Sequence, residues 1–123
     1  MLRASGMDAV LDPEAIPALD GALPLFGSGV TSSLHADNIA ALAALDPAAQ
    51  LHHIASLLID PQTAGGLLAG VPADRAAACL AELRRYGYRA ALIGRVAGLS
   101  GSEPRVYFEA GAAQLVSELV AAK

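Results

Sequence analysis

The stretch Leu57–Val71, LLIDPQTAGGLLAGV, places a short polar insert between two apolar runs. Because Asp60 precedes Pro61, its backbone is biased toward an extended conformation. Gly65 and Gly66 permit positive φ and let another group approach the main chain closely. The question is whether the insert is only a turn or brings its bare backbone close to another group.

The chemistry of this insert supports two interpretations. In the first, the insert is only a sharp turn between two buried elements. In the second, its consecutive backbone amides form an anion-binding nest, and the Thr63 side chain hydrogen-bonds to nearby backbone amides. Physical chemistry alone favours the turn and leaves a phosphate-facing loop as the alternative.

Downstream of the insert, the sequence predicts a strand and then a helix. Residues 66–71 are short, apolar and bounded by glycine and proline, which predicts a buried strand. Apolar side chains recur at helical spacing over residues 72–86, with Asp74 in the first turn and two arginines in the last. Gly87 is placed to end this helix.

Two further strands and a helical tail are predicted after that helix. A period of two from Tyr88 to Val96 predicts a strand, with Tyr88, Ala90, Leu92 and Val96 on one side. Residues 105–110 predict a second strand that could pair with it, across a loop over residues 99–104. From residue 111 onward the composition favours a helix.

Upstream of the insert, four segments carry structural signals. Residues 1–6 are typical of the end of a helix that Gly6 closes. Residues 7–12 predict a short strand, which a proline ends. Residues 31–45 begin with capping residues and continue with good helix formers. Asp46, followed by proline, is typical of a helix N-cap.

The remaining segment, residues 54–59, suits either a helix or a buried strand, because its periodicity does not separate the two. Strands alternate with helices along the chain. We therefore predict an α+β fold, a two-layer domain with a mixed β-sheet covered by helices. The length of 123 residues indicates a single domain.

The composition excludes some classes of protein. Hydrophobic residues make up 54% of the chain and charged residues 16%, with a mean hydropathy of +0.47. No run approaches the roughly 20 apolar residues of a membrane span, so we expect no membrane partner and an apolar surface that meets another protein. A net charge of −4 without basic runs argues against nucleic-acid binding. One cysteine, Cys79, fits a reducing cytoplasm.

Several side chains invite chemical interpretations that their spacing does not favour. His52 and His53 are adjacent, point about 100° apart on a helix and cannot chelate one ion together, and His35 is distant in sequence. Cys79 lies on the apolar side of its predicted helix, which favours core packing over a reactive thiolate. The arginines of the downstream half suit a solvated face; they are Arg84, Arg85, Arg89 and Arg95.

The segment SSLHADN contains the residue types of a nucleophilic triad, with Ser32, His35 and Asp37 within six positions. These residues are too close in sequence to form that geometry on one helix, so capping explains the serine and aspartate better. The loop GLSGSEP lacks the lysine and spacing of a phosphate-binding loop and is expected to join two strands as a hairpin loop.

The run DPQTAGGLL, from Asp60 to Leu68, resembles the C-terminal part of selenophosphate synthetase, also called selenide, water dikinase. That family carries Asp-Pro-Gln-Thr-Ser-Gly-Gly-Leu-Leu, and here Ala64 replaces the serine. The family's Gly-Tyr turn and Ile-Gly pair are matched at Gly87 and Ile93. The resemblance covers about residues 1–109.

This resemblance implies ATP-dependent phosphoryl transfer with magnesium, in a homodimer. Selenide, ATP and water give selenophosphate, AMP and phosphate, and the product donates selenium for selenocysteine and selenouridine synthesis. The implied fold is that of the C-terminal domain of aminoimidazole ribonucleotide synthetase, packed against an N-terminal domain that builds most of the nucleotide site. The residues expected to face the active site are Asp60, Gln62, Thr63, Gly65 and Gly66.

The family's reactive cysteine or selenocysteine, its lysine and its magnesium-binding aspartates are absent from this sequence, and Cys79 does not match that cysteine. We therefore expect no catalytic or metal-binding residue in this chain, and ATP and magnesium bound only in the parent enzyme. The chain is then a C-terminal domain truncated at its N-terminal side. It is expected to be inactive alone and to need the N-terminal ATP-binding domain as its partner.

Two alternatives to this assignment stay open. The first is a free-standing, non-catalytic interaction domain. The second is the C-terminal domain of a related ATP-dependent enzyme, of the thiamine-phosphate kinase or hydrogenase-maturation type. The intact Asp-Pro-Gln-Thr run at Asp60 favours the selenium enzyme over these relatives.

Overall fold

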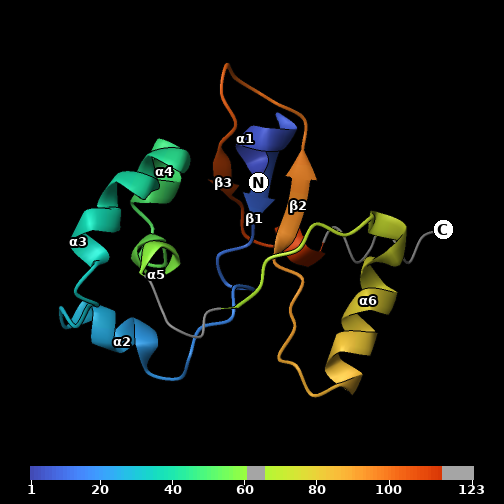
Figure 1. Ribbon diagram of the computed structural model, residues 1–123, viewed down its shortest axis with the longest axis horizontal. Helices are drawn as coiled ribbons and strands as arrows, with labels where there is room; N and C mark the ends of the chain where they lie inside the picture. Colours follow the sequence, from blue (N-terminus) through green and yellow to red (C-terminus); the bar gives the residue numbers. More distant parts are fainter. Residues whose placement is uncertain (61–65, 115–123) are drawn as a thin grey trace.

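The computed structural model describes residues 1–60 and 66–114 and shows an α+β domain (Figure 1). Within the described residues, the strands form one three-stranded mixed sheet in the order β2-β1-β3. The predicted fold class is therefore confirmed. The elements are α1 (Leu2–Ser5), β1 (Asp8–Leu11), α2 (Ala22–Gly27), α3 (His35–Asn38), η1 (Ile39–Ala44), α4 (Pro47–Gln50), α5 (Ala55–Ile59), α6 (Ala73–Arg85), β2 (Gly94–Ala97) and β3 (Val106–Phe108).

Strand β1 lies at the centre of the sheet, antiparallel to β2 and parallel to β3. Val10 is paired with Arg95 on one side and with Tyr107 on the other. The expected pairing of the last two strands with each other is wrong, because β1 lies between them. The chain from β2 to β3 is therefore a crossover connection instead of a hairpin loop.

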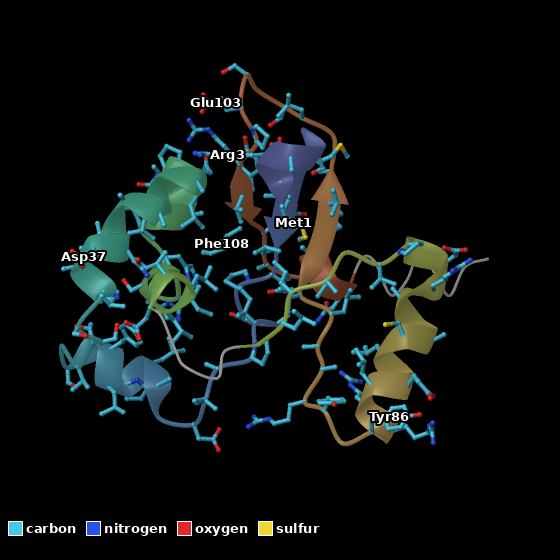
Figure 2. The ribbon with its side chains drawn as sticks, viewed as in Figure 1. Met1, Arg3, Asp37, Tyr86, Glu103 and Phe108 are labelled. Atoms are coloured by element: carbon cyan, nitrogen blue, oxygen red, sulfur yellow. The ribbon has the colours of Figure 1, made fainter. Side chains whose placement is uncertain are left out.

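The helices η1, α4 and α5 form a layer against the β3 side of the sheet (Figure 1). Leu45, Ala49 and Ala55 are buried together at its centre. Val106 and Phe108 pack against them from β3, and Figure 2 shows Phe108 between the strands and these helices. This core of small side chains is what the alanine-rich composition leads one to expect. Small side chains let the helices and the strand approach closely, so that the interior is still densely packed.

Helix α4 begins as the sequence predicts. The Asp46 carboxylate accepts a hydrogen bond from the Ala48 backbone amide at 3.0 Å, and Pro47 occupies the first helical position. The segment that suited either helix or strand is helical, since α5 covers Ala55–Ile59. The N-terminal prediction is also confirmed, because Gly6 closes α1 with φ of 62°.

Helix α6 has the predicted bounds but not the predicted burial. Gly87 has φ of 85°, and its amide and that of Tyr88 close the helix on the carbonyls of Arg84 and Leu83. None of the helix's residues is buried, and α6 stands apart from the sheet (Figure 1). The expected core packing of Cys79 is therefore wrong, because its side chain is only half-buried.

One predicted strand is absent and another is shorter than predicted. Residues 66–71 have no regular secondary structure, and Leu67 is 97% exposed. The strand predicted from Tyr88 begins only at Gly94. Strand β1, with which β2 pairs, ends before Pro13, because proline has no amide proton to donate to a neighbouring strand. The last backbone hydrogen bond between the two segments therefore runs from the Asp12 amide to the Ile93 carbonyl. An alternation of apolar and polar side chains does not form a strand unless a neighbouring strand is long enough to pair with all of it.

The predicted C-terminal helix lies mostly in residues 115–123, outside the described residues. In the described part of the chain, every helix falls short of the length and apolar character needed to cross a bilayer. The buried apolar residues in that part of the chain are Ala9, Val10, Leu45, Ala49, Ile54, Ala55 and Ala112.

Candidate functional site

Asp60 and Gly66 are the two predicted site residues whose positions the structure describes. Asp60 is the residue after α5, and it is buried. Gly66 is exposed, and a Cβ atom added to it would meet no atom of the described residues within 4 Å. The other predicted site residues, Gln62, Thr63 and Gly65, lie outside the described residues.

Helix α5 ends at Asp60 for the reason that the sequence indicates. The backbone of Asp60 is extended, with φ of −76° and ψ of 118°, as expected for a residue before proline. The last carbonyls of a helix have no partner within the helix. Here the Asn38 side-chain amide donates a hydrogen bond to the Ile59 carbonyl at 2.8 Å. A side chain from α3 therefore satisfies the end of α5.

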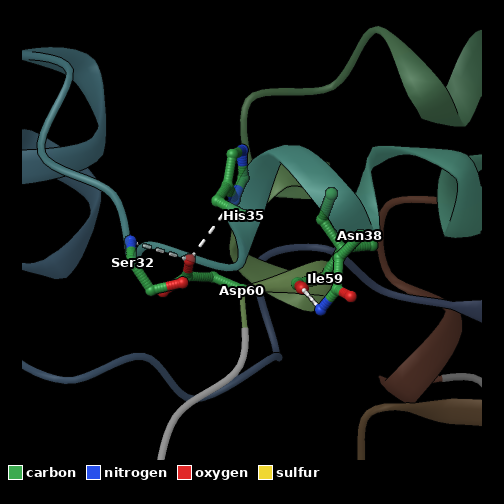
Figure 3. A network of polar contacts seen from close by, with 5 residues as sticks. All are labelled: Ser32, His35, Asn38, Ile59 and Asp60. Carbon is green, nitrogen blue, oxygen red and sulfur yellow. Dashed lines mark hydrogen bonds and ion pairs between the residues drawn. The ribbon is translucent and has the colours of Figure 1, made fainter.

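The Asp60 carboxylate is held by the segment that precedes and begins α3 (Figure 3). The Ser32 backbone amide donates a hydrogen bond to Asp60 Oδ1 at 3.1 Å. His35 Nδ1 lies 3.3 Å from the same oxygen. Only 2% of the Asp60 side chain is exposed, so the Ser32 hydrogen bond and the nearby His35 ring replace part of the water that a carboxylate loses on burial.

The structure changes the interpretation of the segment SSLHADN. Capping does not explain it, because Leu34 is the N-cap of α3 and no side chain caps that helix. His35 contacts Asp60 instead of the neighbouring Asp37. The sequence analysis also missed Asn38. The signal was present in the spacing, because His35 and Asn38 are three residues apart and share one side of a helical turn.

Gly66 does not use the backbone freedom that the sequence analysis gave it. Positive φ occurs at other glycines of the described chain but not at Gly66. Its lack of a side chain is therefore required neither by backbone strain nor by internal packing. Gly66 shares this open position with Gly98 and Gly101, so the described chain leaves room for another group to approach its backbone without requiring one.

A second buried carboxylate, that of Asp8, lies in the sheet. It accepts hydrogen bonds from the Ser100 hydroxyl at 2.6 Å, the Ser100 amide at 2.8 Å and the Arg105 amide at 2.9 Å. The Ser100 hydroxyl contributes most to a lowered pKa of Asp8, followed by the Arg105 amide. Asp8 therefore anchors both ends of the connection between β2 and β3. The sequence analysis missed this role because the partners are more than 90 residues away.

A shallow pocket of ≈ 410 Å³ lies beside Asp8, over one face of the sheet. Its lining is mainly apolar and includes Val10, Ala97 and Phe108, with Tyr107 and Ser100 at the polar side. The Tyr107 and Ser100 hydroxyls hydrogen-bond to each other at 2.9 Å. The polar groups of this pocket thus satisfy one another, which favours a structural role.

In the described ranges, no group of three or more histidine, cysteine and acidic side chains is placed to hold a metal ion. The ring centroids of the adjacent His52 and His53 lie 4.3 Å apart, and the His52 ring meets the Phe108 ring edge-on with a centroid distance of 5.4 Å.

Two of the arginines form ion pairs with glutamates. Arg85 pairs with Glu82 at 2.6 Å, and Arg95 pairs with Glu109 at 3.2 Å.

The chain matches no family model, no curated protein and no solved structure. The resemblance to selenophosphate synthetase therefore stays a prediction that rests on residues of the sequence. The structure adds the geometry of two residues of the DPQTAGGLL run, which are a buried Asp60 at its start and an open Gly66 near its end.

Proposed function

We propose that this chain is the C-terminal domain of a selenophosphate synthetase, an enzyme that makes selenophosphate, AMP and phosphate from selenide, ATP and water. The observation that carries the proposal is the run from Asp60 to Leu68, DPQTAGGLL, which differs from the family's run only at Ala64. The enzyme is a cytoplasmic homodimer that uses magnesium. Its product supplies selenium for selenocysteine and selenouridine synthesis.

The geometry at both ends of the run supports this role. At one end, Asp60 is buried, accepts a hydrogen bond from the Ser32 amide and lies 3.3 Å from His35 Nδ1, so the chain enters the run from a defined position. At the other end, Gly66 faces open space, and nothing within the described chain requires its missing side chain. A fixed Asp60 and a Gly66 without a side chain, one on each side of residues 61–65, suit the close approach of a phosphate group to backbone amides.

The proposal assigns the charged groups of the reaction to another domain. Phosphoryl transfer relies on metal ions and cationic groups around the transferred phosphate. The particular residues that supply them in the family have no counterpart in this sequence, so the proposal places them in the N-terminal ATP-binding domain. Leu67 and Leu68 are 97% and 58% exposed directly after Gly66, and they offer an apolar surface for that domain.

Selenide-dependent AMP release tests the proposal. The chain is mixed with the N-terminal ATP-binding domain of a selenophosphate synthetase, and AMP is measured by chromatography with and without selenide. We expect selenide-dependent AMP from the mixture and none from either part alone. Release of AMP by the chain alone contradicts the proposal, and so does a complex of the two parts, seen by size-exclusion chromatography, that releases none.

A second candidate function, a free-standing interaction domain, is favoured by helix α6. None of its residues is buried, and Leu83 on its apolar side is 40% exposed. Such a helix suits a protein partner even without catalysis. The same mixing experiment separates the two functions, because an interaction domain forms no selenide-dependent AMP with the ATP-binding domain.

A further inference from the structure

Three residues of one short segment hold the two consecutive residues that end α5. Asn38 donates to the carbonyl of Ile59 at 2.8 Å. The Ser32 amide donates to Asp60 Oδ1 at 3.1 Å, and His35 Nδ1 lies 3.3 Å from that oxygen (Figure 3). The 61–65 segment follows directly, so these contacts act at the position where the chain enters the DPQTAGGLL run.

The protonation of His35 Nδ1 follows from its surroundings. The atom is buried and makes no well-aligned hydrogen bond to another described group, and its neighbour is a carboxylate oxygen. An unprotonated Nδ1 would direct a lone pair at that oxygen, whereas an N–H at this position is attracted to it. The carboxylate of Asp60 therefore selects the form of His35 that carries a proton on Nδ1.

No lysine or arginine in the surrounding helices competes with His35 for this carboxylate. The helices α2, α3, η1 and α5 lie within residues 21–45 and 54–60, whose ionisable side chains are His35, Asp37 and Asp60. The His35 ring is also held sterically, since its centroid lies 5.6 Å from that of Phe26 and 16% of its side chain is exposed. A ring fixed in this way presents Nδ1 in one direction.

We propose that His35, protonated on Nδ1, is a positioning residue that fixes Asp60 and thereby the direction in which the chain leaves α5. Asn38 and the Ser32 amide complete this clamp. The purpose of the clamp rests on the proposed function, in which the run after Asp60 faces the reacting phosphate. The tautomer and the clamp are properties of the chain alone and can be measured without catalysis.

NMR of the ¹⁵N-labelled chain tests the clamp. We expect neutral His35 to show a proton on Nδ1 and a bare Nε2, and we expect Asp60→Ala to abolish that preference. His35→Asn keeps an N–H near the position of Nδ1 and leaves the Ser32 amide signal close to its wild-type place. His35→Phe keeps the ring packing on Phe26, removes the donor and shifts the Ser32 signal.

Two results overturn the clamp. One is a bare Nδ1 in wild-type His35. The other is a Ser32 amide signal that is the same in His35→Phe, His35→Asn and the wild type. A purely structural role for the ring predicts the second result, because phenylalanine fills the same space. If one variant fails to fold, the wild-type tautomer and the remaining variant still decide the question.

The AMP assay with the ATP-binding domain tests the purpose of the clamp. We expect His35→Phe to lower kcat by about 10- to 100-fold with KM for ATP changed by less than about twofold, because misplacing a positioned group slows the reaction more than binding. His35→Asn restores most of kcat. An unchanged kcat in His35→Phe contradicts the positioning role, whereas a wild-type mixture without activity contradicts the proposed function and leaves the NMR results to judge the clamp.

Discussion

Gly94 in the sheet and Gly66 after the polar insert lack a side chain for different reasons. A Cβ atom on Gly94 would overlap the carbonyl oxygen of Val10 and come within 2.8 Å of Leu11 Cα, because the positive φ of Gly94, 155°, directs that atom toward the paired strand β1. A Cβ atom on Gly66 would meet nothing within 4 Å. The first glycine is explained by the chain itself, and the second is not.

The same contrast extends to the regions around the two glycines. In the sheet, Asp8 and its partners Ser100 and Arg105 satisfy one another within the chain. After the insert, Leu67 is almost fully exposed, and α6 buries none of its residues. The comparison teaches that the polar groups of the sheet find partners within the chain, whereas the described surface after the insert is left exposed, which is where the proposed partner domain would pack.

Gly94→Ala is expected to have the largest effect on stability. The added methyl group must displace the backbone of Val10 or Leu11 in the central strand. Overpacking of this kind costs about 3 kcal/mol or more when backbone has to move. Urea unfolding followed by circular dichroism measures the change.

Gly98→Ala is the matched control for that variant, since a Cβ atom on Gly98 meets nothing within 4 Å. Its free energy of unfolding should stay within about 0.5 kcal/mol of the wild type. Equal free energies of unfolding for the two variants would contradict the overlap of a Gly94 Cβ atom with the backbone of β1.

Asp8→Asn comes second in expected effect. The amide group keeps one acceptor oxygen but places a donor against the Ser100 or Arg105 amide, so at least one buried donor loses its partner. The unfolding midpoint in urea at neutral pH should fall, by less than for Gly94→Ala. An unchanged midpoint would contradict the anchoring role of Asp8.

The same carboxylate gives a pH dependence whose sign follows from its pKa. Hydrogen bonds, chiefly that of the Ser100 hydroxyl, lower the pKa of Asp8 from its ordinary value of 3.8. The stabilisation is therefore present above that ordinary value and is lost as the pH falls through the lower folded-state pKa. Wild-type stability should drop more steeply than that of Asp8→Asn below about pH 4, as urea midpoints at several pH values would show.

Asp46→Ala is expected to have a smaller effect than the sheet variants. It removes the N-cap hydrogen bond to the Ala48 amide in the packed helix α4, which costs about 1 kcal/mol. Asp74→Ala in the unpacked helix α6 removes only an acidic side chain from the first turn, worth about 0.3 kcal/mol. If the two variants unfold at the same urea concentration, the packed and unpacked helices do not differ as described.

Gly66→Val is expected to have the smallest effect on stability and a large effect on activity. Because the new side chain meets no described atom, the free energy of unfolding should change by less than about 0.5 kcal/mol. AMP release with the ATP-binding domain should fall by about 10- to 100-fold. Gly101→Val, at another open glycine, is the control and should retain activity; equal loss in both variants, or loss of stability in Gly66→Val, would favour a plain turn.

Local signals in the sequence predicted much of the fold. The Asp46 cap, the Gly87 helix end and the bounds of α6 depend on neighbouring residues, so they can be identified without a structure. The strand predictions failed where pairing decides the outcome. Residues 88–93 have the right period, but β1 ends before they could pair with it. The position of β3 beside β1 is likewise a long-range property that no local pattern contains.

The candidate site was predicted only in part for the same reason. Asp60 was identified from its own motif, whereas its partners Ser32 and His35 lie 28 and 25 positions earlier in the sequence. The sequence analysis interpreted their segment by local rules, as caps. Their actual role depends on α3 and α5 meeting in space, which the amino-acid pattern of either helix does not specify.

Hydrogen–deuterium exchange of the amides in residues 66–71 tests the central claim that this surface is covered by another domain. The exchange is measured before and after the ATP-binding domain of a selenophosphate synthetase is added. We expect the partner to slow exchange at residues 66–71, while Gly94–Ala97, already paired with β1, changes little. A bound partner that protects other surfaces and leaves residues 66–71 exchanging at their original rate would contradict the account.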